Sequence, residues 1–238
     1  MSFEFAARGS NRQMKIRLRG RLPIPEDAEV CQILKGLADA AAEQLHQQLI
    51  QLLKDTLVEA DDCLAQKFYN HQNVDQLVKT RAWVVEQLIL LAWDKLMPDS
   101  ETIALVAVGG FGRGELHPQS DVDLLILLSE PTPDEKLRSA IESFVTLLWD
   151  AGFYLGHSAR TVEACVLEAG KDISTATSLM ESRLMAGDKA MFEAMLDATG
   201  ADRVWSAADF FDAKYEEQIK RHEQYHDTAY NLEPNIKE

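Results

Sequence analysis

The residues with the clearest chemical potential lie in one segment, VAVGGFGRGELHPQSDVDLLILL, at positions 106–128. Asp121 and Asp123 stand two residues apart at the start of an apolar run, so on a β-strand both side chains point to the same face. Two carboxylates on one face repel each other unless a positive charge lies between them. A hard divalent cation with oxygen ligands, most commonly Mg²⁺ with nucleotide phosphates, would satisfy this arrangement.

A glycine-rich turn precedes these carboxylates. Gly109 and Gly110 end the apolar run TIALVAV at 102–108, which is typical of a buried strand. A backbone without side chains can approach a ligand closely and offer N–H groups to phosphate oxygens. The GxxxxGK[ST] pattern is absent, and the spacing differs from the dinucleotide fingerprint. A Gly-Gly turn alone is equally typical of a tight turn without a ligand. The informative feature is the combination of strand, Gly-Gly, a ten-residue gap and Asp-x-Asp at the start of a second buried strand.

The elements around this segment follow from periodicity. Helical spacing begins near Ala28, continues over 38–64, and resumes at Asn73, an N-cap with Gln76 three residues later, until Pro98. Strands are expected at 102–108, 121–128 and 153–160, and helices at 134–149, 163–169, 172–186, 188–198 and 206–223. The predicted fold class is therefore α+β, a small mixed sheet with helical flanks. The expected divisions are a basic arm at 1–27, a helical region at 28–100, the core at 101–162 and a helical region at 163–238.

Composition limits the possible partners. The chain has 238 residues with 24 basic and 39 acidic side chains, a net charge of −15, which disfavours broad binding to nucleic acid. No run approaches 18 apolar residues and the amino terminus lacks an apolar h-region, so we expect no membrane span and no signal peptide. Cys31, Cys63 and Cys165 are far apart without a CxxC pair, which favours a reducing cytoplasm over a disulfide framework or zinc site.

The charge is unevenly distributed. Residues 8–25 contain six basic side chains and no acidic one: Arg8, Arg12, Lys15, Arg17, Arg19 and Arg21. Two interpretations are open for this arm, a phosphate-binding or partner-binding tail and a solvated leader.

The strand, glycine and carboxylate pattern resembles the nucleotidyltransferase superfamily typified by DNA polymerase β. Within it, GGFGRGELHPQSDVDLLIL is similar to the bifunctional uridylyltransferase/uridylyl-removing enzymes of bacterial nitrogen control, as are LLWDAGFYLGHSART (147–161), TATSLMESRLMAGD (175–188) and KYEEQIKRHEQYHDTAYNLEPNIK (214–237). The resemblance implies a polymerase β-like core. In this family the chain continues into a phosphohydrolase domain and two ACT domains, so we expect the present chain to correspond to the amino-terminal part.

The resemblance also implies roles for single residues. Gly109 and Gly110 would cradle the triphosphate of UTP, Asp121 and Asp123 would hold two Mg²⁺ ions, and Arg113 and Ser120 would lie beside the phosphates. The acceptor would be a tyrosine of the trimeric PII signalling protein, whose hydroxyl has an ordinary pKa of about 10 and needs help to lose its proton.

One departure from the superfamily concerns a third carboxylate, which usually lies on a later strand. The matching stretch, 152–161, contains no Asp or Glu, and His157 and Ser158 occupy the corresponding place. His157 could orient substrate or act as a base, or it could be a buried, hydrogen-bonded histidine beside Arg160. Transfer of another nucleotide, such as adenylyl transfer, and an inert nucleotide-binding regulatory module are the alternative functions.

Overall fold

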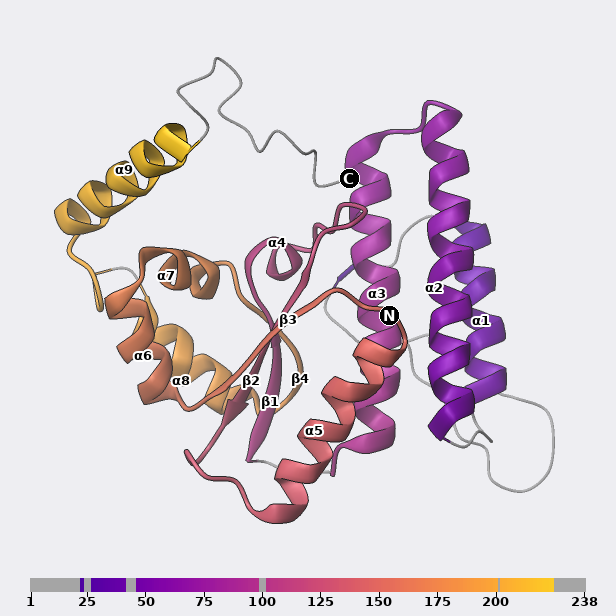
Figure 1. Cartoon of the computed structure of the whole chain (residues 1–238), viewed down its shortest axis with the longest axis horizontal. Helices are drawn as coiled ribbons and strands as arrows, with labels where there is room; N and C mark the ends of the chain where they lie inside the picture. Colours follow the sequence, from indigo (N-terminus) through magenta and orange to yellow (C-terminus); the bar gives the residue numbers. More distant parts are fainter. Residues whose placement is uncertain (1–21, 24–26, 42–45, 99–101, 201, 225–238) are drawn as a thin grey trace. The chain divides into compact units, whose positions relative to one another are not determined.

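The computed structural model of the chain describes residues 22–23, 27–41, 46–98, 102–200 and 202–224 (Figure 1). The chain divides into two compact units. The first comprises Met1–Asp99, Gly114–His117 and Thr132–Gly156, and the second comprises Ser100–Arg113, Pro118–Pro131 and His157–Glu238. The basic residues at 8–21 lie outside the described residues, so the two interpretations of the arm stay predictions.

The first unit is helical. It contains α1 (Ala28–Ala41), α2 (His46–Tyr69), α3 (Val74–Leu96) and α5 (Glu135–Asp150). Asn73 caps α3, as predicted, by accepting a hydrogen bond from the backbone N–H of Gln76 at 3.2 Å. Most of α3 is buried because it packs against both α2 and α5 (Figure 1). The rings of Trp93 on α3 and Phe144 on α5 meet edge to face with centroids 5.3 Å apart.

The second unit is built on a four-stranded mixed sheet with the order β3-β2-β1-β4. The strands are β1 (Ile103–Ala107), β2 (Val122–Leu128), β3 (Leu155–Arg160) and β4 (Arg183–Gly187), and β3 begins two residues before this unit. β1 pairs antiparallel with both β2 and β4, and Ala107 lies opposite Leu124 on one side and Arg183 on the other. The end of β1 and the starts of β2 and β4 therefore meet at one end of the sheet.

Helices cover one face of this sheet. Alternate strand residues, Ala104 and Val106 on β1 with Leu125 and Leu127 on β2, point to the same side and join a buried cluster. The cluster is completed by α6 (Val162–Lys171), α7 (Ile173–Met180) and α8 (Lys189–Thr199). The last described helix is α9 (Ala207–Gln224), and the one-turn α4 (Gly109–Gly112) follows β1. The predicted α+β class is confirmed.

The prediction of one helix over 172–186 is wrong. α7 ends at Met180, and β4 begins at Arg183 and adds an edge strand beside β1. Leu184 and Met185 are buried there, although leucine, methionine and alanine all favour helices. The backbone donors and acceptors of β1 on this side need a partner, and strand pairing supplies it. The sheet therefore extends beyond the 101–162 segment that was expected to hold the core.

Among the described residues, no helix combines the length and the apolar character needed to cross a bilayer.

Candidate active site

The glycine turn is formed at the end of β1. The backbone N–H of Val108 donates to the carbonyl oxygen of Asp123 at 3.1 Å, which fixes the exit of β1 beside the start of β2. The chain then turns at Gly109, whose φ of 58° lies in the left-handed region that favours glycine. Two further backbone bonds close α4, from Gly112 N–H to Val108 O and from Arg113 N–H to Gly109 O, both at 3.1 Å.

The missing side chain of Gly109 leaves a space in front of a predicted metal ligand. A Cβ atom at this position would lie 3.7 Å from Oδ2 of Asp123 and 3.8 Å from Oγ of Ser178. The turn, the start of β2 and α7 thus converge on one point. This brings together two of the predicted site residues, Gly109 and Asp123, and adds Ser178, which was not predicted.

Asp121 and Asp123 flank the first residue of β2. Both are exposed, while Val122 and Leu124 between and after them are buried. This alternation agrees with the prediction that the two carboxylates share a face. The strand anchors itself in the core through its apolar side chains and leaves its acidic end at the rim.

The donor set at this rim suits Mg²⁺. Mg²⁺ prefers oxygen ligands and usually combines one or two carboxylates with substrate phosphates and water. Asp121 and Asp123 supply carboxylate oxygens, and the space at Gly109 can receive a ligand atom. Within the described part of the chain, no three His, Cys, Asp or Glu side chains group closely enough to hold a metal by themselves. Phosphate oxygens would have to complete the coordination.

The turn between α7 and β4 braces α4. Gly112 packs so closely that a Cβ atom there would lie 1.9 Å from the carbonyl oxygen of Glu181. The guanidinium of Arg183 donates from Nε to the carbonyl of Gly112 at 3.2 Å and from Nη2 to that of Phe111 at 3.3 Å. It also lies over the ring of Phe111, with Cζ 5.9 Å from the centroid. Arg183 thereby holds the end of the one-turn helix α4 against the sheet.

The remaining predicted residues surround this turn. Arg113 caps the end of α4 and forms an ion pair with Glu181, so its guanidinium already has a carboxylate partner. Ser120 is half-buried directly before Asp121, and Gly110 lies within α4. His157 is exposed on β3, the neighbour of β2, so the interpretation of a buried histidine is wrong.

A carboxylate orients the helix that carries Ser178. Asp172 caps α7 by accepting from the backbone N–H groups of Ser174 at 3.3 Å and Thr175 at 2.8 Å, and from the Thr175 hydroxyl at 2.7 Å. The hydrogen bond from the Thr175 side chain is the main reason that the pKa of Asp172 lies below its usual range. The N-cap fixes where α7 starts and therefore where Ser178 and Glu181 lie.

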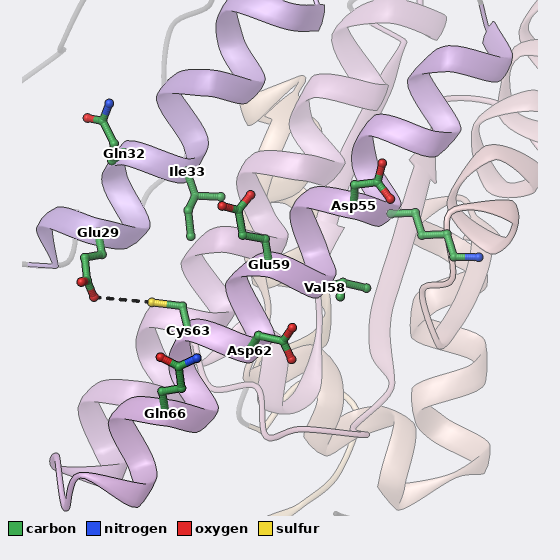
Figure 2. A pocket seen from close by; sticks show the side chains of 10 residues that line it. Glu29, Gln32, Ile33, Asp55, Val58, Glu59, Asp62, Cys63 and Gln66 are labelled. Carbon is green, nitrogen blue, oxygen red and sulfur yellow. Dashed lines mark hydrogen bonds between the residues drawn. The ribbon is translucent and has the colours of Figure 1, made fainter.

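A separate groove runs between α1 and α2 in the first unit, with a volume of about 790 Å³ (Figure 2). Four carboxylates line it, Glu29, Asp55, Glu59 and Asp62, against one lysine, Lys54. Cys63 points toward Glu29, with Sγ and Oε2 3.7 Å apart, and burial raises the pKa of this thiol (Figure 2). A lining with this charge repels a triphosphate, so the groove is a poor candidate for the nucleotide site.

Sequence reasoning missed Ser178, Glu181 and Arg183. They lie 55 to 60 positions beyond Asp123, and their contribution depends on α7 and the start of β4 packing beside α4. The only sequence signal for these three residues is that the stretch 175–188 is similar to the family, and this similarity assigns no role to any of them.

Two family models match parts of the chain. A nucleotidyltransferase domain family matches residues 89–157, and a family described as GlnD PII-uridylyltransferase matches residues 209–238. A solved structure, "Crystal structure of the toxin-antitoxin with AMP-PNP", aligns over 60% of this chain and 96% of its own with 15% identity and a TM-score of 0.31, which is too low to support an inference.

Curated relatives are much closer in sequence. The bifunctional uridylyltransferase/uridylyl-removing enzyme of Pseudomonas syringae pv. tomato is 46% identical over 189 residues, and that of Nitrosococcus oceani is 46% identical over 190. The corresponding protein of Pseudomonas aeruginosa is 45% identical over 189 residues. Each alignment covers 79% of this chain and 21% of the relative, so the chain spans about one fifth of their length. Over this aligned part, the chain is similar to the bifunctional uridylyltransferase/uridylyl-removing enzymes.

Proposed function

We propose that the chain carries a nucleotidyl-transfer site that moves UMP from UTP to a tyrosine of the PII signalling protein and releases pyrophosphate. The observation that carries the proposal is the convergence of the Gly109 turn with the carboxylate of Asp123, in a chain 46% identical to uridylyltransferases. The family match described as GlnD PII-uridylyltransferase supports PII as the acceptor.

In the proposed reaction, the tyrosine oxygen bonds to the α-phosphorus of UTP, and the bond from that phosphorus to the pyrophosphate oxygen breaks. Asp121 and Asp123 would hold Mg²⁺, which supplies neutralisation of the triphosphate charge when bound. Gly109 and Gly110 would let the backbone approach the phosphates, because no side chain intervenes. The site would thus act through positioning and electrostatics.

The phenolic proton must leave during the attack. With an ordinary pKa of about 10, the tyrosine is almost wholly protonated at neutral pH. His157 is the side chain we propose as its acceptor, because it is exposed on the strand beside β2 and an imidazole can act as a general base. Arg113 and Ser120 are proposed to lie beside the phosphates. The carboxylate of Glu181 would then compete with the nucleotide for the guanidinium of Arg113.

The proposal includes a cytoplasmic location. Its support is the cysteine usage, since Cys31, Cys63 and Cys165, all within the described residues, form no disulfide.

Mass spectrometry of the acceptor tests the proposal. The purified chain is incubated with UTP, Mg²⁺ and PII protein, and we expect PII to gain one UMP per modified tyrosine. Parallel reactions with ATP, CTP or GTP identify the transferred nucleotide, and a PII variant with phenylalanine at the acceptor tyrosine shows the site of attachment. Tight binding of UTP without any modification of PII would favour the inert nucleotide-binding module instead.

A control variant separates the proposed metal ligands from general charge effects. Asp121→Asn should abolish transfer, whereas Glu130→Gln should not, because Glu130 is an exposed carboxylate beyond the opposite end of β2. Equal losses in both variants would contradict the assignment.

A further inference from the structure

We infer that Ser178 is a nucleotide-binding residue of this site, with its hydroxyl donating a hydrogen bond to a non-bridging oxygen of the triphosphate. The inference rests on the proposed function, because it names a new contact in the same site. Ser178 belongs to α7, about 70 residues after the glycine turn, and neither spacing nor motif singles it out.

Geometry is the first support. The hydroxyl oxygen of Ser178 and the carboxylate oxygen Oδ2 of Asp123 each lie within 4 Å of the point where Gly109 would carry a Cβ. The two groups therefore border the same space from different elements. Gly109 is the only one of the three that leaves that space open, because it has no side chain to fill it.

The chemistry of the two groups is complementary. An ionised carboxylate can only accept hydrogen bonds, so it repels a phosphate oxygen unless a cation intervenes. A serine hydroxyl can donate a hydrogen bond to that oxygen directly. On this division, Asp123 would hold the cation and Ser178 would hold the phosphate that the cation accompanies.

Both threonine hydroxyls of the helix are hydrogen-bonded elsewhere. The Thr175 hydroxyl donates to Asp172 at 2.7 Å, and the Thr177 hydroxyl donates to the carbonyl of Ile173 at 2.8 Å. Within the described residues, no hydrogen bond engages the hydroxyl of Ser178. Its side chain is half-buried at the rim, whereas Ala176 and Leu179 on the same helix are buried in the core.

The position of Ser178 is also fixed by contacts that do not involve its own side chain. One helical turn further on, the backbone carbonyl of Glu181 abuts Gly112, and the Glu181 carboxylate pairs with Arg113. At the start of α7, Asp172 holds the first turn. Removing the Ser178 hydroxyl should therefore leave α7 in place, so that a loss of affinity can be assigned to the lost contact.

The test is calorimetric titration of the full chain with UTP and with inorganic tripolyphosphate, both with Mg²⁺. We expect Ser178→Ala to bind both ligands about tenfold more weakly or worse, because it loses a hydrogen bond to a charged group. Ser178→Thr keeps the hydroxyl and should recover most of the affinity. Thr177→Val is the matched control, because it removes a hydroxyl of the same helix that is already hydrogen-bonded, and it should bind as the wild type does.

Several results would overturn the inference, and they can be told apart. If Asp123→Asn loses nucleotide while Ser178→Ala keeps wild-type affinity, the contact is wrong and the proposed function stands. If Ser178→Ala weakens Mn²⁺ binding without nucleotide as much as Asp123→Asn does, the hydroxyl serves the cation rather than the phosphate. A lower melting temperature of Ser178→Ala with unchanged affinity would mean a structural role. If the wild-type chain binds neither ligand, the proposed function fails and the inference fails with it.

Discussion

Gly109 and Gly112 belong to the same one-turn helix, yet alanine should have different effects at the two positions. At Gly112 the new Cβ would lie 1.9 Å from the carbonyl oxygen of Glu181 and 3.0 Å from that of Ala107, and both neighbours are backbone atoms. Real Cβ atoms essentially never come closer than 3.0 Å, so the α7–β4 turn would have to move by about 1 Å. At Gly109 the neighbours lie at ordinary contact distances, and only the φ of 58° is unfavourable.

The expected magnitudes follow from these two causes. Overpacking against backbone costs about 1–3 kcal/mol or more, and we expect Gly112→Ala to lie at the upper end because Arg183 also holds this turn. Left-handed backbone costs an alanine about 1–2 kcal/mol, so Gly109→Ala should be less destabilising. Its main effect should be weaker binding of UTP, because the methyl group fills the space in front of Asp123.

Hydrogen exchange measures the two effects where they arise. The opening free energy of peptides from β1, β2 and β4 should fall by about 3 kcal/mol in Gly112→Ala. Peptides from α3, in the first unit, provide an internal reference. A Gly112→Ala protein within about 0.5 kcal/mol of the wild type would refute the close packing of α4 against Glu181.

Three further predictions concern single side chains. Asp172→Ala should lower the free energy of unfolding by about 1 kcal/mol at pH 7 in urea titrations. The hydrogen bond from Thr175 lowers the folded-state pKa of Asp172, so the contribution of this carboxylate to stability is fully present above its unfolded-state pKa. The difference in stability between wild type and variant should therefore disappear as the pH falls through the folded-state pKa. Equal stability of the two proteins at pH 7 would contradict this prediction. Burial raises the pKa of Cys165 from its ordinary value of 9.0 to about 11, so the thiol favours folding fully below pH 9.0 and that contribution is lost as the pH rises to about 11. The loss should approach about 2–3 kcal/mol, and Cys165→Ala should lack this slope; a wild type whose stability is flat over this range would contradict it. Arg183→Ala should weaken UTP binding several-fold by releasing α4, with partial recovery in Arg183→Lys, and an unchanged affinity in titrations would show that this brace is dispensable.

Short-range signals in the sequence predicted the helices and strands whose formation depends mainly on their own residues. The cap at Asn73, the β-branched run before Gly109 and the apolar run after Asp121 each correspond to an observed element. The Gly-Gly turn and the shared face of Asp121 and Asp123 were also predictable, because glycine conformation and strand alternation are short-range properties.

The features that the sequence did not predict depend on contacts between distant parts of the chain. Residues Arg183–Gly187 form a strand only because β1 offers them an edge, and their own composition favours a helix. Ser178 approaches Gly109 only because α7 packs beside α4. Neither relation leaves a periodic or spacing signal in the sequence, so both become apparent only in the folded chain.

Asp121 and Asp123 are proposed to hold a divalent cation together with UTP beside the Gly109 turn. Mn²⁺ can replace Mg²⁺ as an oxygen-ligated cation, and electron paramagnetic resonance reports the free ion in a titration of the full chain with and without UTP. We expect UTP to tighten Mn²⁺ binding in the wild type and in Glu130→Gln, and we expect Asp121→Asn and Asp123→Asn each to bind Mn²⁺ with UTP about tenfold more weakly or worse. Wild-type binding of Mn²⁺ and UTP by either aspartate variant would contradict it.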